Sequence, residues 1–298
     1  MFYYTAFGLN ISSEIEFPEM LISTKADSTD VNIILGKVPP FPEDGSTINE
    51  RLWITPNEFL MHFKDVATYY AKNGNLIIAE VNADAERKLV RLYLLCNAMA
   101  AIIHQRKLIP LHCSGIITQK GVAIIVGQSG AGKSTTTKAL TQKGHRIFTD
   151  DVCVLKIKNN AISAIPSYPV MKLWERSFEL LQLGIASESD MYSANFNKYR
   201  VFFHDHFVNE WQPVSTIFNL TVSEDSKEVS ITKQNGIEAF VTIGENTYRN
   251  YYVEPMQLNA VHFEMISRLA QQCEVYKIVR PPTVDSIAVV VEMIENAM

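Results

Sequence analysis

The chain has 298 residues, 47% of them apolar, which is enough to bury a full hydrophobic core in one large or two modest domains. Its formal net charge of −5 gives no electrostatic reason to expect a nucleic-acid partner. The four cysteines lie far apart, no apolar run has the length of a membrane-spanning helix, and no basic residue precedes Lys25. We therefore expect a soluble, cytoplasmic protein that binds neither nucleic acid nor membranes.

The first 82 residues predict an N-terminal β-rich subdomain. Short apolar or alternating runs, broken by Pro, Gly, Asp and Ser, lie at Phe2–Ile11, Val31–Leu35 and Leu60–Tyr70. The runs 66–72 and 75–81 flank Asn73-Gly74, a dipeptide that accepts the positive φ angles of a type I′ turn, so they should form a hairpin. The competing interpretation is that these strands extend the sheet of the main domain.

The second domain is expected to run from residue 83 to residue 298. Its first element, Asp84–Gln105, has the apolar spacing of an amphipathic helix. Leu111–Thr118, which carries His112, then predicts a strand that pairs as a hairpin with the apolar strand Val122–Val126.

A glycine-rich stretch, the glycine loop, follows that apolar strand directly. It fits the P-loop (Walker A) pattern G-x-x-x-x-G-K-[ST] and reads Gly127-Gln128-Ser129-Gly130-Ala131-Gly132-Lys133-Ser134, with Thr135 next. In the order strand, loop, helix, the loop N–H groups and the helix N-terminus face phosphate oxygens. Lys133 would reach the β- and γ-phosphates, and the Ser134 hydroxyl would bind Mg²⁺. We therefore predict a nucleotide site formed by residues 127–135, in preference to an ordinary glycine turn.

Two carboxylates end the short strand that follows the helix of the glycine loop. The helix is expected over Ser134–Lys143, with Gly144 as its left-handed C-terminal residue. The strand 145–148 then leads into Thr149-Asp150-Asp151. At this place a phosphoryl-transfer site needs one carboxylate to hold Mg²⁺ and one to orient or deprotonate the attacking hydroxyl. The alternative is a solvated acidic turn.

The remaining chain offers one more candidate pair. Lys198 and Arg200 would stabilise charge on the transferring phosphoryl group, and a solvated basic pair is the equal alternative. The other expectations are an irregular segment at 166–173, helices at 174–183, 257–271 and 283–298, antiparallel strands at 214–222 and 229–232, and a strand at 275–279.

These residues together resemble the catalytic domain of the HPr kinase/phosphorylase family. That family has a histidine on the strand before the P-loop and a G-H-R-x-x-x-D-D segment after the P-loop helix. The matching stretches here are Leu111–Gly115, the glycine loop and Lys143–Asp151. The resemblance implies an α/β fold of the HPr kinase/phosphoenolpyruvate-carboxykinase type, preceded by the β-rich subdomain.

The resemblance also implies roles for single residues. It implies ATP, or another nucleoside triphosphate, and Mg²⁺ as cofactors. Asp150 is expected to be the base that takes the acceptor proton, and Asp151 is expected on the metal side with Ser134, although the pair could exchange roles. His112 would hydrogen-bond beside the phosphates, with a packed strand histidine as the even alternative.

The segments Ala6–Ile11, Ser13–Ile15, Val170–Trp174 and Lys198–Arg200 are similar to a particular branch, the kinases that phosphorylate a C-terminal serine of lasso-peptide precursors. The prediction is an ATP-dependent serine kinase whose acceptor is a peptide or small protein. The alternatives are a P-loop ATPase or nucleotide-binding switch, and a kinase of free serine or another small hydroxylated molecule. The hairpins and the C-terminal helix leave room for a homo-oligomer.

Overall fold

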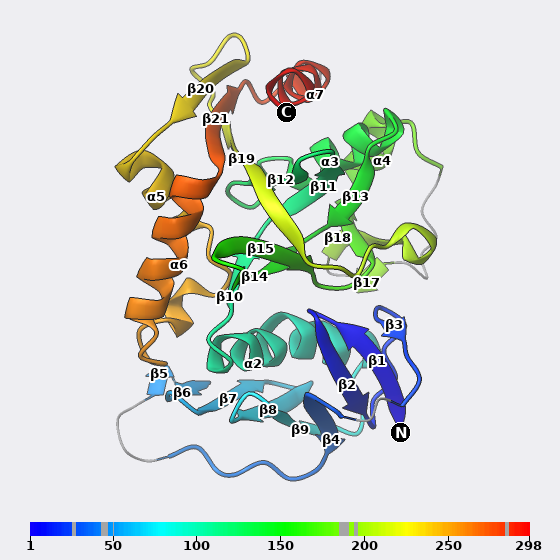
Figure 1. Cartoon of the computed structure of the whole chain (residues 1–298). Helices are drawn as coiled ribbons and strands as arrows, with labels where there is room; N and C mark the ends of the chain where they lie inside the picture. Colours follow the sequence, from blue (N-terminus) through cyan, green and yellow to red (C-terminus); the bar gives the residue numbers. More distant parts are fainter. Residues whose placement is uncertain (26–27, 43–46, 50, 185–190, 194–195, 284–285) are drawn as a thin grey trace. The chain divides into compact units, whose positions relative to one another are not determined.

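The computed structural model describes residues 1–25, 28–42, 47–49, 51–184, 191–193, 196–283 and 286–298 (Figure 1). The chain is a mixed α/β protein that divides into two compact units. The first unit holds Met1–Pro110 and Arg249–His262, and the second holds Leu111–Tyr248 and Phe263–Met298. The domain boundary expected after residue 82 thus falls inside the first unit.

Within the described residues, the first unit carries a nine-stranded sheet of order β3-β1-β2-β4-β9-β8-β7-β6-β5. Its strands are β1 (Phe2–Ala6), β2 (Leu9–Ser13), β3 (Leu21–Ile22), β4 (Val31–Leu35), β5 (Thr47–Asn49), β6 (Leu52–Ile54), β7 (Glu58–Phe63), β8 (Ala67–Lys72) and β9 (Leu76–Val81). The run expected at 2–11 is two strands because Phe7 and Gly8 turn the chain with φ of 56° and 72°. The predicted hairpin is confirmed as β8 and β9, with φ of 54° at Asn73 and 68° at Gly74.

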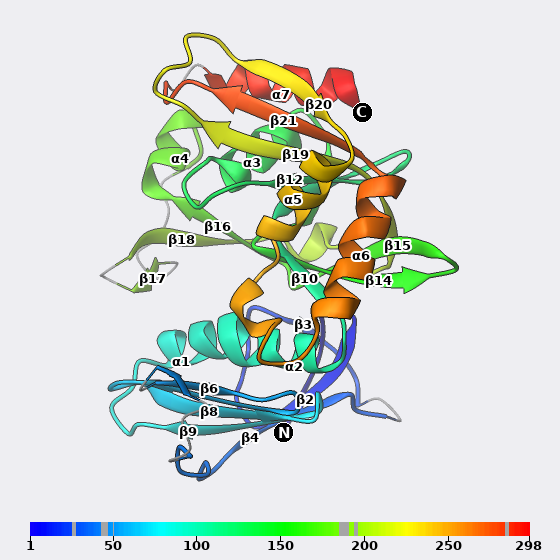
Figure 2. The same cartoon turned by 90° about the vertical axis from the view of Figure 1, so that its left-hand side faces the viewer.

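One long helical stretch covers this sheet. It consists of α1 (Arg87–Tyr93), the π-helical η1 (Leu94–Ala98) and α2 (Met99–Gln105), and it lies along one face of β6–β9 (Figure 2). The Tyr69 hydroxyl donates to the Val90 carbonyl at 2.7 Å, and the Gly74 N–H donates to the Gln105 side chain at 2.8 Å. The predicted helix therefore forms, and its packing on β8 and β9 places it in the first unit. The first unit also holds the short 3₁₀ helix η4 (Asn250–Tyr252).

The second unit is built around the strand that leads into the glycine loop. Its strands include β11 (Ser114–Thr118), β12 (Gly121–Val126), β13 (Arg146–Thr149), β14 (Val152–Lys158), β15 (Ala161–Pro166), β19 (Gln212–Val222), β20 (Ser230–Gln234) and β21 (Glu274–Arg280). Its helices include α3 (Lys133–Gln142), α4 (Glu175–Leu180), η3 (His204–His206), α5 (Ile237–Glu245) and α7 (Ser286–Ala297). Two elements, β10 (Ile109–His112) and α6 (Asn259–Gln272), have residues in both units. β11 pairs antiparallel with both β12 and β13. The strands β12 and β13 therefore run in the same direction, and their carboxyl ends meet at one edge of the sheet.

Strand pairing refines one expectation about this unit and corrects another. β20 pairs antiparallel with β21, and β21 pairs parallel with β19, so β19 and β20 run antiparallel as expected, but β21 lies between them. The segment expected to be irregular contains the strand β16 (Val170–Trp174), which pairs with β18 (Phe196–Phe202), itself paired with β17 (Met191–Ser193). Both differences arise because distant partners supply hydrogen bonds that local sequence patterns do not reveal.

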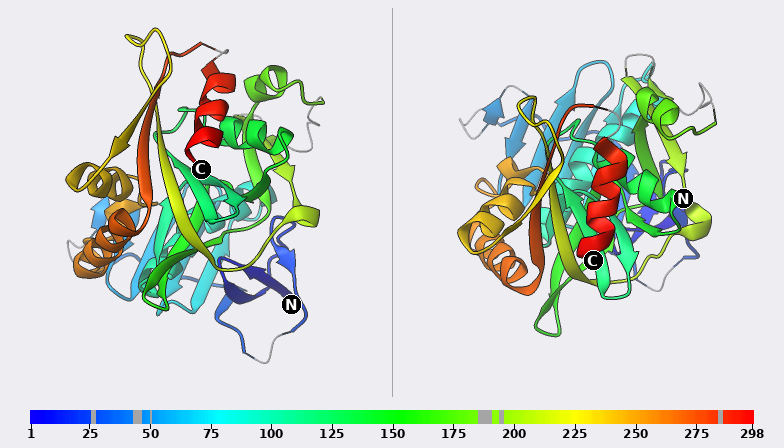
Figure 3. Two further views of the ribbon diagram at one scale, coloured as in Figure 1. Left: turned by 45° about the horizontal axis from the view of Figure 1, so that its top comes forward. Right: turned by 90° about the horizontal axis from the view of Figure 1, so that it is seen from above.

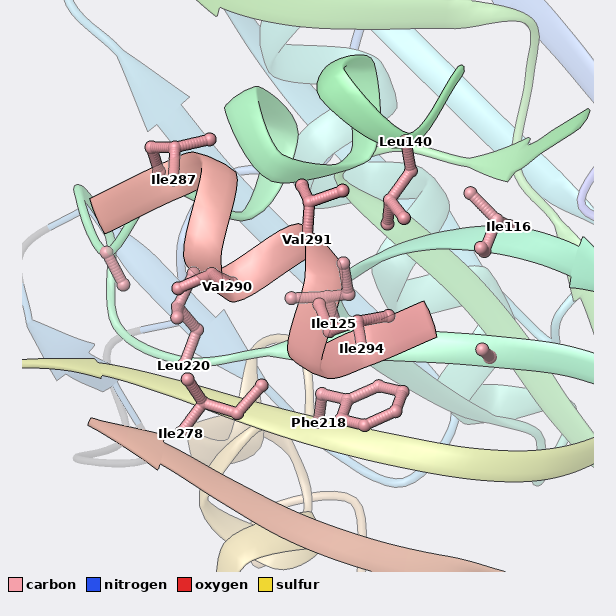
Figure 4. Close-up of a cluster of buried hydrophobic side chains, with 12 residues drawn as sticks. Ile116, Ile125, Leu140, Phe218, Leu220, Ile278, Ile287, Val290, Val291 and Ile294 are labelled. Carbon is pink, nitrogen blue, oxygen red and sulfur yellow. The ribbon is translucent and has the colours of Figure 1, made fainter. Parts of the chain in front are cut away.

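The core of this unit lies between the sheet and two helices. α7 packs beside α3 (Figure 3), and its buried side chains Ile287, Val290, Val291 and Ile294 meet the sheet residues Ile125, Phe218 and Ile278 (Figure 4). Leu140 of α3 joins the same cluster. Gly144 follows α3 with a φ of 98°, which confirms its left-handed C-terminal position.

The end of β12 approaches β19 so closely that Gly127 has no room for a side chain. A Cβ there would lie 2.2 Å from the Leu220 carbonyl oxygen, and φ is 137°. We expect Gly127→Ala to lower the free energy of unfolding by about 3 kcal/mol, through strain and overlap together. Gly144→Ala, which meets no atom within 4 Å, should lower it by about 1 kcal/mol through the positive φ alone. Urea unfolding measures the free energy of unfolding of both variants. Equal decreases would mean that overlap with the Leu220 carbonyl adds nothing to the cost at Gly127.

Candidate active site

The glycine loop is tied at its first residue to a distant part of its unit. Gly127, Gly130 and Gly132 all have positive φ angles, of 137°, 85° and 105°. The Gly127 N–H donates to the Asn246 side chain at 2.9 Å, and the Asn246 carbonyl accepts from the His112 N–H at 2.8 Å. Asn246 therefore ties the loop to the strand that carries His112, a link between residues far apart in sequence.

Lys133 begins α3 and is turned back over the loop. Its side-chain amine donates to the carbonyl oxygens of Gly127 at 2.8 Å and Gln128 at 3.2 Å. The residue is only 7% exposed, and this burial lowers the pKa of the amine, against the opposing effect of the nearby Asp150. The lysine is therefore positioned by the loop itself.

Asp150 is buried beneath the start of α3. One carboxylate oxygen accepts from the Ser134 hydroxyl at 2.8 Å and from the Ser114 hydroxyl at 2.5 Å. The other accepts from the backbone N–H of Lys172 at 2.8 Å. Burial raises the pKa of Asp150, although these hydrogen bonds oppose the shift. Asp150, and not Asp151, is thus the carboxylate in contact with the serine of the glycine loop.

Asp151 has a left-handed backbone, with φ of 70°, and a different set of partners. Its carboxylate accepts from the Lys172 ammonium at 2.5 Å, and its backbone carbonyl lies 2.9 Å from His112 Nδ1. Burial acts to raise the pKa of Asp151, but the charge and the hydrogen bond of Lys172 outweigh it, so the pKa lies well below its usual range. Burial also lowers the pKa of His112, which favours a neutral ring whose Nδ1–H donates to that carbonyl. The neighbouring carboxylates are therefore held in unlike surroundings.

The raised pKa of Asp150 predicts that its ionised carboxylate lowers the stability of the unliganded protein at neutral pH, because the folded state holds the proton more tightly than the unfolded state. Stability from such a group is present at low pH and is lost as the pH rises above about 4, the unfolded pKa, through the folded pKa. We expect metal-free Asp150→Asn to be more stable than the wild type by about 1 kcal/mol at pH 8, with a smaller difference at pH 5. Urea unfolding at both values tests this, and a difference that shrinks with rising pH would contradict it.

The two basic residues expected from the sequence lie on one strand, β18, but have different surroundings. Lys198 lies in the wall of the site, with its amine 4.5 Å from the centre of the Trp174 ring. Arg200 is 8% exposed and its guanidinium lies 5.5 Å from the centre of the Phe202 ring. Among the described residues Arg200 is not part of the cavity wall. Its role at the reacting phosphate therefore has no support in the geometry.

A cavity of about 550 Å³ joins these groups. Its described wall includes five cationic residues and three acidic ones, namely Lys133, Lys172, Arg176, Lys198 and Arg280, and Asp150, Asp151 and Glu175. His112, Ser129, Gly130, Gly132, Ser134 and Thr135 also line it. The excess of positive charge suits a polyanionic ligand.

Sequence reasoning assigned no role to Ser114, Lys172, Arg176, Asn246 or Arg280. Lys172 lies on β16, in a segment expected to be irregular, and Arg280 ends a strand whose neighbours were not known. Lys172 lies in the segment Val170–Trp174 that carries the second resemblance, but Val-Met-Lys-Leu-Trp does not alternate between polar and apolar residues, so no local pattern indicated its pairing with β18. Arg280 stands in no short motif.

The oxygens beside the glycine loop fit a hard cation. Ser134 and Asp150 supply hydroxyl and carboxylate oxygens, which Mg²⁺ prefers together with water and phosphate oxygens. In the part of the chain that the structure describes, no group of three or more His, Cys, Asp or Glu residues is placed to hold a metal by itself. No helix among the described residues has the length and apolar character needed to cross a membrane.

Comparison with known proteins finds a distant relative. The chain is 28% identical over 137 residues to an HPr kinase/phosphorylase of Lactobacillus acidophilus, a match that covers 44% of this chain and 41% of the relative. Part of the chain is therefore similar to a protein of that description, over less than half of its length. No protein family model matches the chain.

A solved structure can also be partly superposed on the chain. It is the Hpr(Ser) kinase/phosphatase from Coxiella burnetii, with a TM-score of 0.32 and 15% identity, covering 63% of this chain and 89% of that one. This score does not establish a common fold, so the mixed α/β architecture rests on the sheets and helices described above.

Proposed function

We propose that the protein is a kinase that transfers the γ-phosphoryl group of ATP to a serine hydroxyl. The observation that supports it is the contact between Ser134 and Asp150 beside an ion-paired second carboxylate, Asp151, in one cavity with Lys133. This combination suits phosphoryl transfer, because catalysis of that reaction consists mainly of positioning and charge neutralisation. The distant similarity to an HPr kinase/phosphorylase favours the same chemistry.

The geometry favours the exchanged roles of the two carboxylates. Asp150 touches Ser134, so these two would hold Mg²⁺, which neutralises charge on the phosphates when bound. Asp151 is held ionised by Lys172 and lies beside His112, so it would accept the hydrogen bond and then the proton of the attacking hydroxyl. Lys133 would bind the β- and γ-phosphates, and Lys198 would neutralise charge near Asp151.

The proposal extends to the fold and the acceptor. The second unit would be a catalytic domain of the HPr kinase type, acting in the cytoplasm. Its acceptor would be a peptide or small protein, and the C-terminal serine of a lasso-peptide precursor is the first candidate because of the similar segments at 170–174 and 198–200.

The test is to incubate the protein with γ-labelled ATP and Mg²⁺ and a panel of acceptors. The panel holds peptides that end in serine, the same peptides with alanine in that place, peptides with internal serine, and free serine. A kinase puts stoichiometric label on one serine acceptor and none on its alanine counterpart. Release of free phosphate at a rate that no acceptor changes would instead indicate an ATPase or a switch.

A further inference from the structure

Arg280 ends β21 and its guanidinium rests against the glycine loop. Nε and Nη2 donate to the Ala131 carbonyl oxygen at 3.2 and 3.0 Å. Nη1 donates to the Pro281 carbonyl and the Ser286 hydroxyl, each at 3.1 Å. A Cβ placed on Gly132 would lie 3.1 Å from Nη2, so the group packs directly on the loop backbone.

The charge of Arg280 is buried, and among the described residues it is paired with no anion. The residue is 8% exposed, and the acceptors of its four hydrogen bonds are carbonyl and hydroxyl oxygens, which carry no full charge. Among the described residues no carboxylate forms an ion pair with it. Burial of a cation without a counter-ion is strongly unfavourable. Binding of an anion beside the Arg280 guanidinium would therefore be favourable, because the anion would neutralise the buried charge.

A second arginine reinforces the positive charge at this place. Arg176 lines the same cavity, and after burial its charge is the next cause that lowers the pKa of Arg280. Two guanidinium groups that line the same cavity repel each other, and an anion between them would offset that repulsion by attracting both. The wall here also includes the apolar residues Pro282 and Ile287.

The donors of Arg280 are almost all in use, which limits how it can bind. A guanidinium has five N–H groups, and four serve the protein contacts above, so one hydrogen on Nη2 is left for a ligand among the described contacts. That hydrogen belongs to the nitrogen beside Gly132, in the middle of the glycine loop. The loop N–H groups there are the ones that bind phosphates in this motif.

We propose that Arg280, supported by the charge of Arg176, binds an oxygen of the polyphosphate chain of the nucleotide and that the site therefore recognises its ligand mainly through that chain. The inference rests on the nucleotide site of the proposed function, and it requires no phosphoryl transfer. It concerns Arg280 and Arg176 as ligand-binding residues of the same cavity as Lys133.

The test compares two ligands, ADP and inorganic tripolyphosphate, which has the phosphates but neither base nor ribose. Their dissociation constants are measured by calorimetry for the wild type and for Arg280→Met, Arg280→Lys and Arg176→Met. Arg268→Met on α6 is the control, because Arg268 is an exposed partner of Glu264 outside the cavity. For each variant, the melting temperature with ligand is also compared with the melting temperature of the same variant without ligand. This ligand-induced rise can be interpreted even if the substitution changes the stability of the protein.

Arg280→Met should weaken the binding of both ligands by a similar factor, about 10- to 100-fold, as expected for loss of one charge-assisted hydrogen bond. Arg280→Lys, which keeps the charge, should lose less, and Arg268→Met should change nothing. Unchanged affinities in Arg280→Met would overturn the inference. So would a loss confined to ADP, which would place Arg280 against the base or ribose. If the protein binds both ligands but phosphorylates no acceptor, the proposed kinase activity is contradicted and this inference is not.

Discussion

Asp151→Asn is expected to lower the rate of phosphoryl transfer about 10³-fold, with less than about a threefold change in nucleotide affinity. Asn keeps the shape of the side chain but cannot take the proton of the attacking hydroxyl, and it loses the ion pair with Lys172. The rate is measured as labelled acceptor formed at saturating ATP and Mg²⁺, and the affinity by calorimetry with ADP.

Asp150→Asn is the matched comparison, because the two residues are neighbours and Asp150 contacts Ser134. It should raise the Mg²⁺ concentration needed for half-maximal activity, which Asp151→Asn should leave unchanged. Asp225→Asn, in an exposed turn, controls for the loss of one carboxylate elsewhere. If Asp150→Asn lowered the transfer rate at saturating Mg²⁺ without changing the Mg²⁺ concentration for half-maximal activity, and Asp151→Asn kept the wild-type rate, Asp150 would be the base.

Lys133→Met is expected to weaken ATP binding about 100-fold, since the variant removes the charged donor that would bind the β- and γ-phosphates and keeps a side chain of similar length. The unliganded protein should retain its stability, because the buried ammonium is replaced by an apolar group in a site where burial already lowers the lysine pKa. Equilibrium binding and urea unfolding measure the two effects.

Lys138→Met is the control for Lys133, since Lys138 lies on the same helix and outside the described cavity wall. Its ATP affinity should equal that of the wild type. Retention of ATP affinity within about twofold by Lys133→Met would mean that the glycine loop does not bind a triphosphate in the way its motif indicates.

Elements with a local cause could be predicted from the sequence. The hairpin at Asn73-Gly74 and the C-terminal position of Gly144 are confirmed, because both depend on residues that tolerate positive φ at those points. The strand before the glycine loop and the helix after it also form where they were expected. The domain boundary differs, because the packing of α1 and α2 on β8 and β9 was not visible in the helix pattern itself.

The amino-acid sequence by itself determined which chemical groups are available: a glycine loop with a lysine and a serine, two adjacent carboxylates, and a histidine on a nearby strand. Only the tertiary structure decided which of these groups contact each other and therefore which role each can have. It brought Ser134 to Asp150 and Lys172 to Asp151, and it set Arg280 against the loop from a strand almost 150 residues away in sequence. Local patterns report the conformations that a few residues prefer, whereas these contacts depend on long-range strand pairing and on burial, which set the charge of each group.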